Sequence, residues 1–287
     1  MRKHLSSIIL CVVFLIGLSL LLYPVLSNLV NERSQSRAIA TYEDGLSTLT
    51  KEDYTAFWQA AQEYNANLTA GVGSTLTAEQ QADYDAVLDP TGTGIMGYVE
   101  IPCIRVSLPI YHGVSEQVLQ IGAGHLPGSS LPVGGEGTHC VLSGHRGLPS
   151  ARLFTDLDQV GVGDCFLLHI MDETLAYQVD QIRIVEPAEV KDLAIVPGED
   201  YCTLVTCTPY GVNTHRLLVR GHRVAYTAEE EKNGIAVTAD AAQIDSLVVQ
   251  VWLLVPVLIG MLLILLAGSC RRPRKQSKNE EEERDST

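Results

Sequence analysis

The sequence predicts a mainly β domain that is flanked by two transmembrane helices, with further helices between the first span and the β-rich part. Three observations lead to this prediction. An uncharged apolar run lies near each end of the chain, helix-capping patterns follow the first run, and short β-rich runs separated by turns fill the middle. Several short strands at such spacing indicate a closed barrel or a sandwich.

The composition excludes two broad classes of protein. The 287 residues include 20 Lys and Arg against 34 Asp and Glu, which gives a formal net charge of −14. Because an acidic surface repels polyanions, nucleic acid is excluded as the main partner. Apolar residues make up 46% of the chain and charged residues 19%, so the chain is not globally disordered.

The two apolar runs are long enough to cross a lipid bilayer, since a spanning helix needs roughly 20 residues. The first lies in residues 1–30 and the second is residues 246–270. A cleaved signal peptide is the alternative for the first run. Its apolar core is longer than usual, and the small-residue site at 38–40 lies too far beyond it, so we favour an uncleaved anchor.

Basic residues on the outer flanks of both runs predict the topology. Arg2 and Lys3 precede the first run, and four basic residues follow the second within residues 271–275. Positive flanks remain cytoplasmic, so we predict a two-pass protein of the cell membrane with both termini inside and the segment between the spans outside. An acidic linker at 228–245 and a charged cytoplasmic tail at 271–287 complete this arrangement.

Residues 31–93 are predicted to be helical before the first β run. A capping pair at Thr50 and Asp53 opens one helix, and apolar residues then recur at three- and four-residue steps. A second, shorter helix begins at Thr77 with Gln80. We interpret the apolar face of the first helix as a surface that packs on a domain rather than one that binds a ligand.

Residues 94–227 form the predicted β domain. Short runs rich in β-forming residues alternate there with Gly, Pro and Asp turns. The runs are Met96–Ile101, Val106–Ile110, His139–Ser143, Cys165–Ile170, Ala176–Val185, Tyr201–Cys207 and Arg216–Val224.

Five of the seven cysteines lie between the two apolar runs, and an odd number outside a membrane implies a free or intermolecular thiol. We interpret four of them as small core side chains: Cys103, Cys140, Cys165 and Cys202. Their spacing fits no zinc pattern, so we expect neither a metal site nor a cofactor.

The fifth cysteine, Cys207, ends a β run and precedes a turn-forming loop, after which a second β run starts at Arg216. If these two strands pair, the thiol and the guanidinium lie at the same end of neighbouring strands. A cation beside a cysteine favours the nucleophilic thiolate, and the N–H groups of arginine can hold an oxyanion.

A Gly-flanked histidine, His145, ends another β run in the stretch Ser143-Gly-His-Arg-Gly147. Acyl transfer from a cysteine needs a proton donor for the leaving amine, and histidine is the usual one. On spacing alone, a structural turn is an equally good interpretation of this stretch.

These residues resemble the signature of the sortase family. Thr203-Leu-Val-Thr-Cys207 with Arg216 is similar to the family's cysteine and arginine motif, and Ser143-Gly-His145 to its histidine motif. Longer sequence segments resemble those of the pilus-assembling class C sortases in particular. They are YPVLSN at 23–28, GHLPGSSLPVGG at 124–135, SGHRGLPSARLFTDLD at 143–158 and CTPYGVNTHRLLVRG at 207–221, and the resemblance covers roughly residues 20–225.

The resemblance implies a closed eight-stranded sortase β-barrel with added N-terminal helices. It implies that Cys207 attacks the Thr–Gly bond of an LPXTG-like sorting signal, that His145 moves the protons and that Arg216 holds the substrate oxyanion. The partners would be pilin or surface-protein substrates, and the acceptor would be a lysine amine of another pilin subunit.

Class C sortases also carry an Asp-Pro-aromatic lid over the active site. Asp89 and Pro90 stand after the short helix and before the barrel, as a lid would, but the third residue is Thr91 rather than an aromatic residue. We therefore expect a lid at these three residues that closes only weakly.

Two other functions are compatible with the sequence. One is a housekeeping sortase that attaches surface proteins to the peptidoglycan of a Gram-positive cell wall. The other is a membrane-tethered binding module without catalytic activity. The C-terminal span, the N-terminal helices and the Asp89-Pro90 pair favour the pilin polymerase.

Overall fold

The computed structural model describes residues 2–68, 71–72, 76–226 and 254–263. Contacts divide the chain into two units, one made of residues 1–25 with 243–287 and the other of residues 26–242. The predicted linker and charged tail lie outside the described residues, as do both ends of the predicted second span.

A single helix, α1 (Arg2–Leu46), contains the predicted N-terminal anchor and continues well beyond it. Among the described residues it is the one helix long and apolar enough to cross a membrane, from Ile8 onward. The described part of the second apolar run is the short apolar helix Leu254–Leu263. One membrane anchor is therefore supported, and the second span stays a prediction.

Two amphipathic helices follow α1, and each begins at the capping residue that the sequence predicted. Thr50 caps α2 (Lys51–Ala66) and Thr77 caps α3 (Ala78–Ala86). In both, the threonine side chain accepts the backbone N–H of the third helical residue, and that residue's side chain accepts the N–H of the threonine. Such a box satisfies donors that a helix start leaves without partners.

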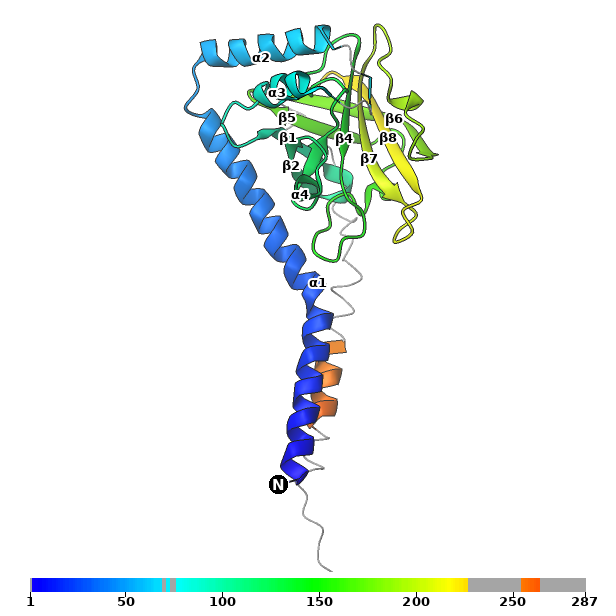
Figure 1. Cartoon of the computed structure of the whole chain (residues 1–287). Coiled ribbons are helices and arrows are strands. Elements are labelled where there is room, and N and C mark those ends of the chain that lie inside the picture. Colours follow the sequence, from blue (N-terminus) through cyan, green and yellow to red (C-terminus); the bar gives the residue numbers. More distant parts are fainter. Residues whose placement is uncertain (1, 69–70, 73–75, 227–253, 264–287) are drawn as a thin grey trace, which may run out of the picture. The chain divides into compact units, whose positions relative to one another are not determined.

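Eight strands close into a barrel in the order β1-β2-β3-β4-β7-β8-β6-β5 (Figure 1). The strands are β1 (Ile95–Ile101), β2 (Val106–His112), β3 (Ala123–His125), β4 (Thr138–Ser143), β5 (Cys165–Ile170), β6 (Glu173–Val185), β7 (Asp200–Thr208) and β8 (His215–Val224). Short helical turns lie between them: η1 (Pro102–Ile104), α4 (Glu116–Leu119), η2 (Leu157–Gln159) and η3 (Lys191–Leu193). The closed barrel is confirmed over the sandwich.

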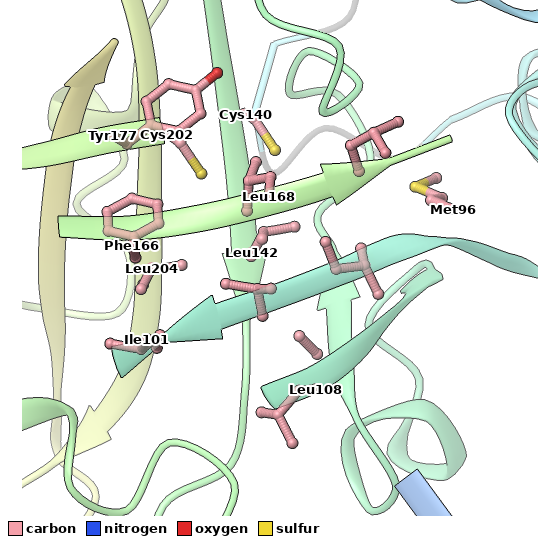
Figure 2. Close-up of a cluster of buried hydrophobic side chains, with 14 of the residues drawn as sticks. Met96, Ile101, Leu108, Cys140, Leu142, Phe166, Leu168, Tyr177, Cys202 and Leu204 are labelled. Carbon is pink, nitrogen blue, oxygen red and sulfur yellow. The ribbon is translucent and has the colours of Figure 1, made fainter. Parts of the chain in front are cut away.

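Alternate residues of these strands point into the barrel and form its core (Figure 2). The core includes the fully buried side chains Met96, Ile101, Leu142, Phe166, Leu168 and Leu204. The end of α1 is tied to this core by Tyr42, whose hydroxyl donates to the carbonyl of Met96 at 3.0 Å and accepts the N–H of Met171 at 2.9 Å. The helix and the barrel therefore share one hydrophobic core.

Candidate active site

Cys207 and Arg216 lie directly opposite each other where β7 and β8 pair. The two strands are antiparallel, as the sequence predicted, and the loop between them returns the chain so that Cys207 faces Arg216 in the register. Directly opposed residues in an antiparallel pair point to the same face of the sheet. The thiol and the guanidinium are thus presented together on the outer face of the barrel.

His145 reaches the same edge because β4 pairs with β7 in parallel. The last paired residues are Ser143 and Val205. The alignment continues past them, since the N–H of Gly144 donates to the carbonyl of Val205 at 3.0 Å and the hydroxyl of Thr206 donates to the carbonyl of Gly144 at 2.8 Å. One step further, the register brings His145 level with Cys207. Of the three predicted catalytic residues, Cys207 thus lies on β7 and Arg216 on β8, and His145 lies two residues past the end of β4.

Glycine is required at position 144 by close packing. A Cβ atom there would lie 2.5 Å from the ring of Phe154, which is fully buried. The N–H of Phe154 also donates to the carbonyl of His145 at 3.1 Å. The glycine before the histidine thus lets the chain lie against this ring, and the contact fixes the backbone position of His145.

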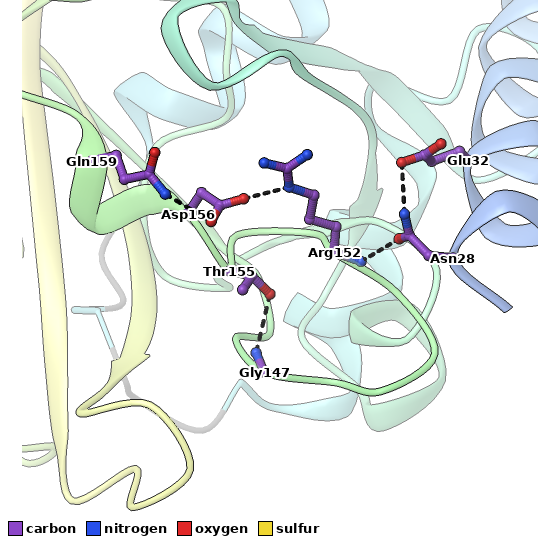
Figure 3. Close-up of polar contacts among 7 residues, drawn as sticks. All are labelled: Asn28, Glu32, Gly147, Arg152, Thr155, Asp156 and Gln159. Carbon is purple, nitrogen blue, oxygen red and sulfur yellow. Dashed lines mark hydrogen bonds and ion pairs between the residues drawn. The ribbon is translucent and has the colours of Figure 1, made fainter. Parts of the chain in front are cut away.

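The loop after His145 is braced both internally and by α1 (Figure 3). Within the loop, the N–H of Gly147 donates to the hydroxyl of Thr155 at 3.1 Å. From α1, the side-chain oxygen of Asn28 accepts the N–H of Arg152 at 2.8 Å. Asn28 is the last residue of the YPVLSN segment at 23–28, and this contact is its structural role.

Two polar residues near the site, Glu116 and Arg146, were not predicted from the sequence. Glu116, at the start of α4, places a carboxylate oxygen 3.3 Å from Nε2 of His145. Hydrogen bonds from Gln120 and then the charge and hydrogen bond of His145 lower the pKa of the exposed Glu116 carboxyl. Glu116 thus holds one ring nitrogen of His145 through this contact.

The second such residue, Arg146, ties the strand ends together. Its side chain is only 9% exposed; Nη1 donates to the hydroxyl of Thr208 at 3.3 Å, and Nη2 forms an ion pair with Asp158. Because Thr208 follows Cys207 and Arg146 follows His145, this side chain bridges the neighbours of two predicted catalytic residues.

Arg216 makes contacts that leave its charge available. Its Nη1 donates to the backbone carbonyls of His215 at 3.1 Å and Asn213 at 3.4 Å. No carboxylate forms an ion pair with it among the residues that the structure describes. A guanidinium held by backbone carbonyls beside a thiol is suited to bind an oxyanion.

The three residues predicted as a lid lie elsewhere in their described contacts. Asp89 accepts the N–H of Gly94 at 3.0 Å, and the methyl group of Thr91 packs against Gly45 near the end of α1. Neither residue has a described contact with Cys207 or Arg216. In these contacts Asp89 shapes the turn into β1, and the role of the three residues as a lid stays a prediction.

A different segment packs on the face that carries the thiol. Val72 contacts an apolar cluster that includes Val205 and Leu218, and the carbonyl of Gly71 would lie 2.6 Å from a Cβ atom at Gly128. Val205 is two residues from Cys207, and Leu218 two from Arg216, so they share a face with the predicted catalytic pair. Gly71 and Val72 therefore pack on the face of the barrel that carries this pair.

Similar proteins were found by sequence and by structure. A family model described as a sortase domain matches residues 99–224. Sortase C1 from Streptococcus agalactiae is 55% identical over 67% of this chain and 100% of that chain, with a TM-score of 0.65. Sortase C from Streptococcus pneumoniae is 47% identical over 67% of this chain and 98% of its own, with a TM-score of 0.60. Among curated relatives, a sortase A of Streptococcus agalactiae is 32% identical over 149 residues, and the alignment spans 57% of that protein.

Proposed function

Because this chain belongs to the sortase family of cysteine transpeptidases and is similar in structure to class C members, we propose that it polymerises pilins. It would cleave an LPXTG-like sorting signal between Thr and Gly and transfer the threonyl group to a lysine amine of another pilin subunit. The pairing of Cys207 with Arg216 across one ladder is the observation that supports this proposal most directly.

In the first half of the reaction, the sulfur of Cys207 attacks the threonine carbonyl and a tetrahedral oxyanion forms. Arg216 donates N–H groups to that oxyanion, where charge develops. His145 gives a proton to the departing glycine amine, the C–N bond breaks and a thioester remains on Cys207.

In the second half, the lysine amine of the acceptor attacks the thioester and His145 takes the amine's proton. The isopeptide bond forms and the thiol is released. A thioester keeps most of the acyl-transfer potential, so the reaction needs no ATP. Water competes with the amine, so the enzyme gains by positioning the amine and shielding the thioester.

The location of the protein follows from its anchor. The apolar part of α1 supports attachment to the cell membrane. We propose that residues 246–270 form a second span, so that the barrel faces outward and both termini are cytoplasmic. Substrates that are themselves membrane-anchored surface proteins would meet the barrel there.

The test uses the full-length chain in detergent with an LPXTG-type peptide and an amine acceptor. A covalent adduct on Cys207, found by mass spectrometry and absent from Cys207→Ala, is the expected intermediate. Added amine should divert product from the free acid to the amide. A binding module would give no adduct, and a thiol protease would hydrolyse the peptide regardless of amine.

The choice between polymerase and housekeeping enzyme needs protein substrates. Candidate pilins are mixed with the enzyme and the joined residues are mapped by mass spectrometry. A Thr-to-Lys isopeptide bond between subunits supports the proposal. Exclusive transfer to a peptidoglycan-type amine would assign the housekeeping function instead.

A further inference from the structure

Two buried cysteines, Cys140 and Cys202, lie side by side inside the barrel. Cys140 on β4 and Cys202 on β7 are directly opposed in the parallel ladder. Their exposed fractions are 2% and 0%. Figure 2 shows both sulfur atoms in the core, between Tyr177 and Leu168. The chemistry proposed for the site uses neither residue.

The geometry of this pair fits a disulfide bond. Neighbouring strands are about 4.8 Å apart, so opposed Cα atoms lie inside the range of about 4.4–6.8 Å that disulfides span. The two thiols are already within hydrogen-bonding contact of each other. Closing the bond therefore needs side-chain rotation and little movement of the backbone.

The surroundings of the pair are closed to solvent. His125 contacts Cys140, and its ring is itself fully buried between the hydroxyl of Tyr84, at 2.9 Å, and the carbonyl of Ser130, at 2.8 Å. Burial raises the pKa of Cys202, whereas hydrogen bonds from Cys202 and His125 outweigh burial and lower that of Cys140. Cys140 is therefore the thiol of the pair that ionises first, and the thiolate is the form that attacks a disulfide.

We propose that Cys140 and Cys202 are joined by a disulfide bond that forms while the barrel folds outside the membrane. The inference rests on the outward orientation of the barrel given under the proposed function. The two thiols lose two protons and two electrons to the disulfide of an oxidant, such as a thiol–disulfide oxidoreductase or a small-molecule disulfide. One S–S bond forms in the protein, and the S–S bond of the oxidant breaks to give two thiols.

The bond would act on the same strand pair that assembles the catalytic residues. His145 lies five positions beyond Cys140, two residues past the end of β4, and Cys207 lies five positions beyond Cys202 on β7. A covalent link between Cys140 and Cys202 thus fixes the register that brings His145 level with Cys207. Parallel strands joined by a long connection have no tight turn to set that register, so a cross-link is most useful there.

The first test maps the thiols of the full-length protein after extraction from membranes. Free thiols are blocked with N-ethylmaleimide in denaturant, before any reductant is added, and the peptides are identified by mass spectrometry. We expect Cys207 to carry the label, while the peptides of Cys140 and Cys202 appear joined and separate only after reduction. Labelling of both Cys140 and Cys202 without reduction would overturn the proposal. This result does not depend on any sorting activity, so it is independent of whether the proposed function holds.

The second test compares thermal unfolding with and without dithiothreitol in the wild type and in a Cys140→Ala/Cys202→Ala double variant. Loss of a disulfide that closes a long loop should lower the Tm of the wild type by roughly 5–15 °C. The double variant should show no such shift on reduction. Equal Tm values for the wild type with and without reductant would also overturn the proposal.

Discussion

Cys207 on β7 and Arg216 on β8 face each other in the antiparallel ladder, although the two strands are separated by the loop of residues 209–214. The pair is set by backbone hydrogen bonds rather than by contact between the two side chains. The barrel therefore fixes the backbone position of each residue, while each side chain can change its rotamer when a substrate binds.

Replacing Arg216 by lysine should lower the rate of transpeptidation by about 100-fold, because the charge remains but the planar set of N–H donors is lost. The measurement is kcat/KM with an LPXTG-type peptide and an amine acceptor. Arg183→Lys is the matched control, since Arg183 is an exposed arginine of β6 that pairs with Asp192. Equal activity of Arg216→Lys and the wild type would exclude oxyanion binding by Arg216.

Replacing Gly144 by alanine should displace the start of the His145 loop. The new Cβ atom would lie 2.5 Å from the ring of Phe154, an overlap that costs about 1–3 kcal/mol of stability. We expect a lower Tm together with a larger loss of activity than the loss of folded protein explains. Gly161→Ala is the control, because its nearest neighbour is 3.7 Å away, an ordinary contact. A variant as stable and active as Gly161→Ala would show that the loop tolerates the shift.

Trimming Val72 to alanine should loosen the segment of Gly71 and Val72 that packs on the face of the predicted catalytic pair. The side chain of Val72 packs against the apolar cluster that includes Val205 and Leu218, and its truncation removes apolar contact that holds the segment there. We expect peptide hydrolysis to rise about two- to tenfold. Asp89→Ala serves as the comparison and should change activity little, because Asp89 accepts its described hydrogen bond from Gly94, at the turn into β1. A clear gain from Asp89→Ala and none from Val72→Ala would restore the lid to residues 89–91.

The stability of the barrel should fall as the pH drops through the range near 6.5, in part because of His139. Burial lowers the pKa of this ring, which lies between the carbonyl of Ala194 and the hydroxyl of Thr203, with Arg220 and Asp180 as its charged neighbours. Its pKa is lower in the folded than in the unfolded chain, so the unfolded chain binds the proton first as the pH falls. The contribution is therefore present above the unfolded value of about 6.5 and is lost below it.

The measurement for this effect is the Tm between pH 7.5 and about pH 5. In His139→Gln, the Tm at neutral pH should be lower but its decline toward acid pH should be shallower than in the wild type. Parallel curves for the two proteins would show that His139 does not contribute to the acid sensitivity.

The local elements of the fold were largely predictable from the sequence. Seven β runs were assigned within a few residues of the observed strands, and both capping boxes lie where they were predicted. The missed strand, β3, has three residues and includes a glycine, so it offers no alternation for a pattern to detect. It exists because β2 and β4 pair with it on either side.

The lid at Asp89, Pro90 and Thr91 stays a prediction, and the described contacts of these residues could not be read from the sequence. Asp89 and Pro90 match part of a family motif, and the described contacts of Asp89 and Thr91 lie at the start of β1 and the end of α1. Gly71 and Val72 match no such motif. They lie beside the catalytic pair because Val72 finds an apolar surface and Gly71 passes closely over Gly128.

The sequence by itself determined the functional groups of the candidate site and the β runs beside them. These groups are a thiol, an imidazole and a guanidinium, each at the end of a β run. It also determined the pairing of β7 with β8, because strands joined by a short loop lie side by side and pair antiparallel. Only the tertiary structure decided that β4 lies parallel to β7. That pairing depends on barrel closure and on the register of residues far apart in the chain. It is what brings His145 level with Cys207 and Cys140 against Cys202.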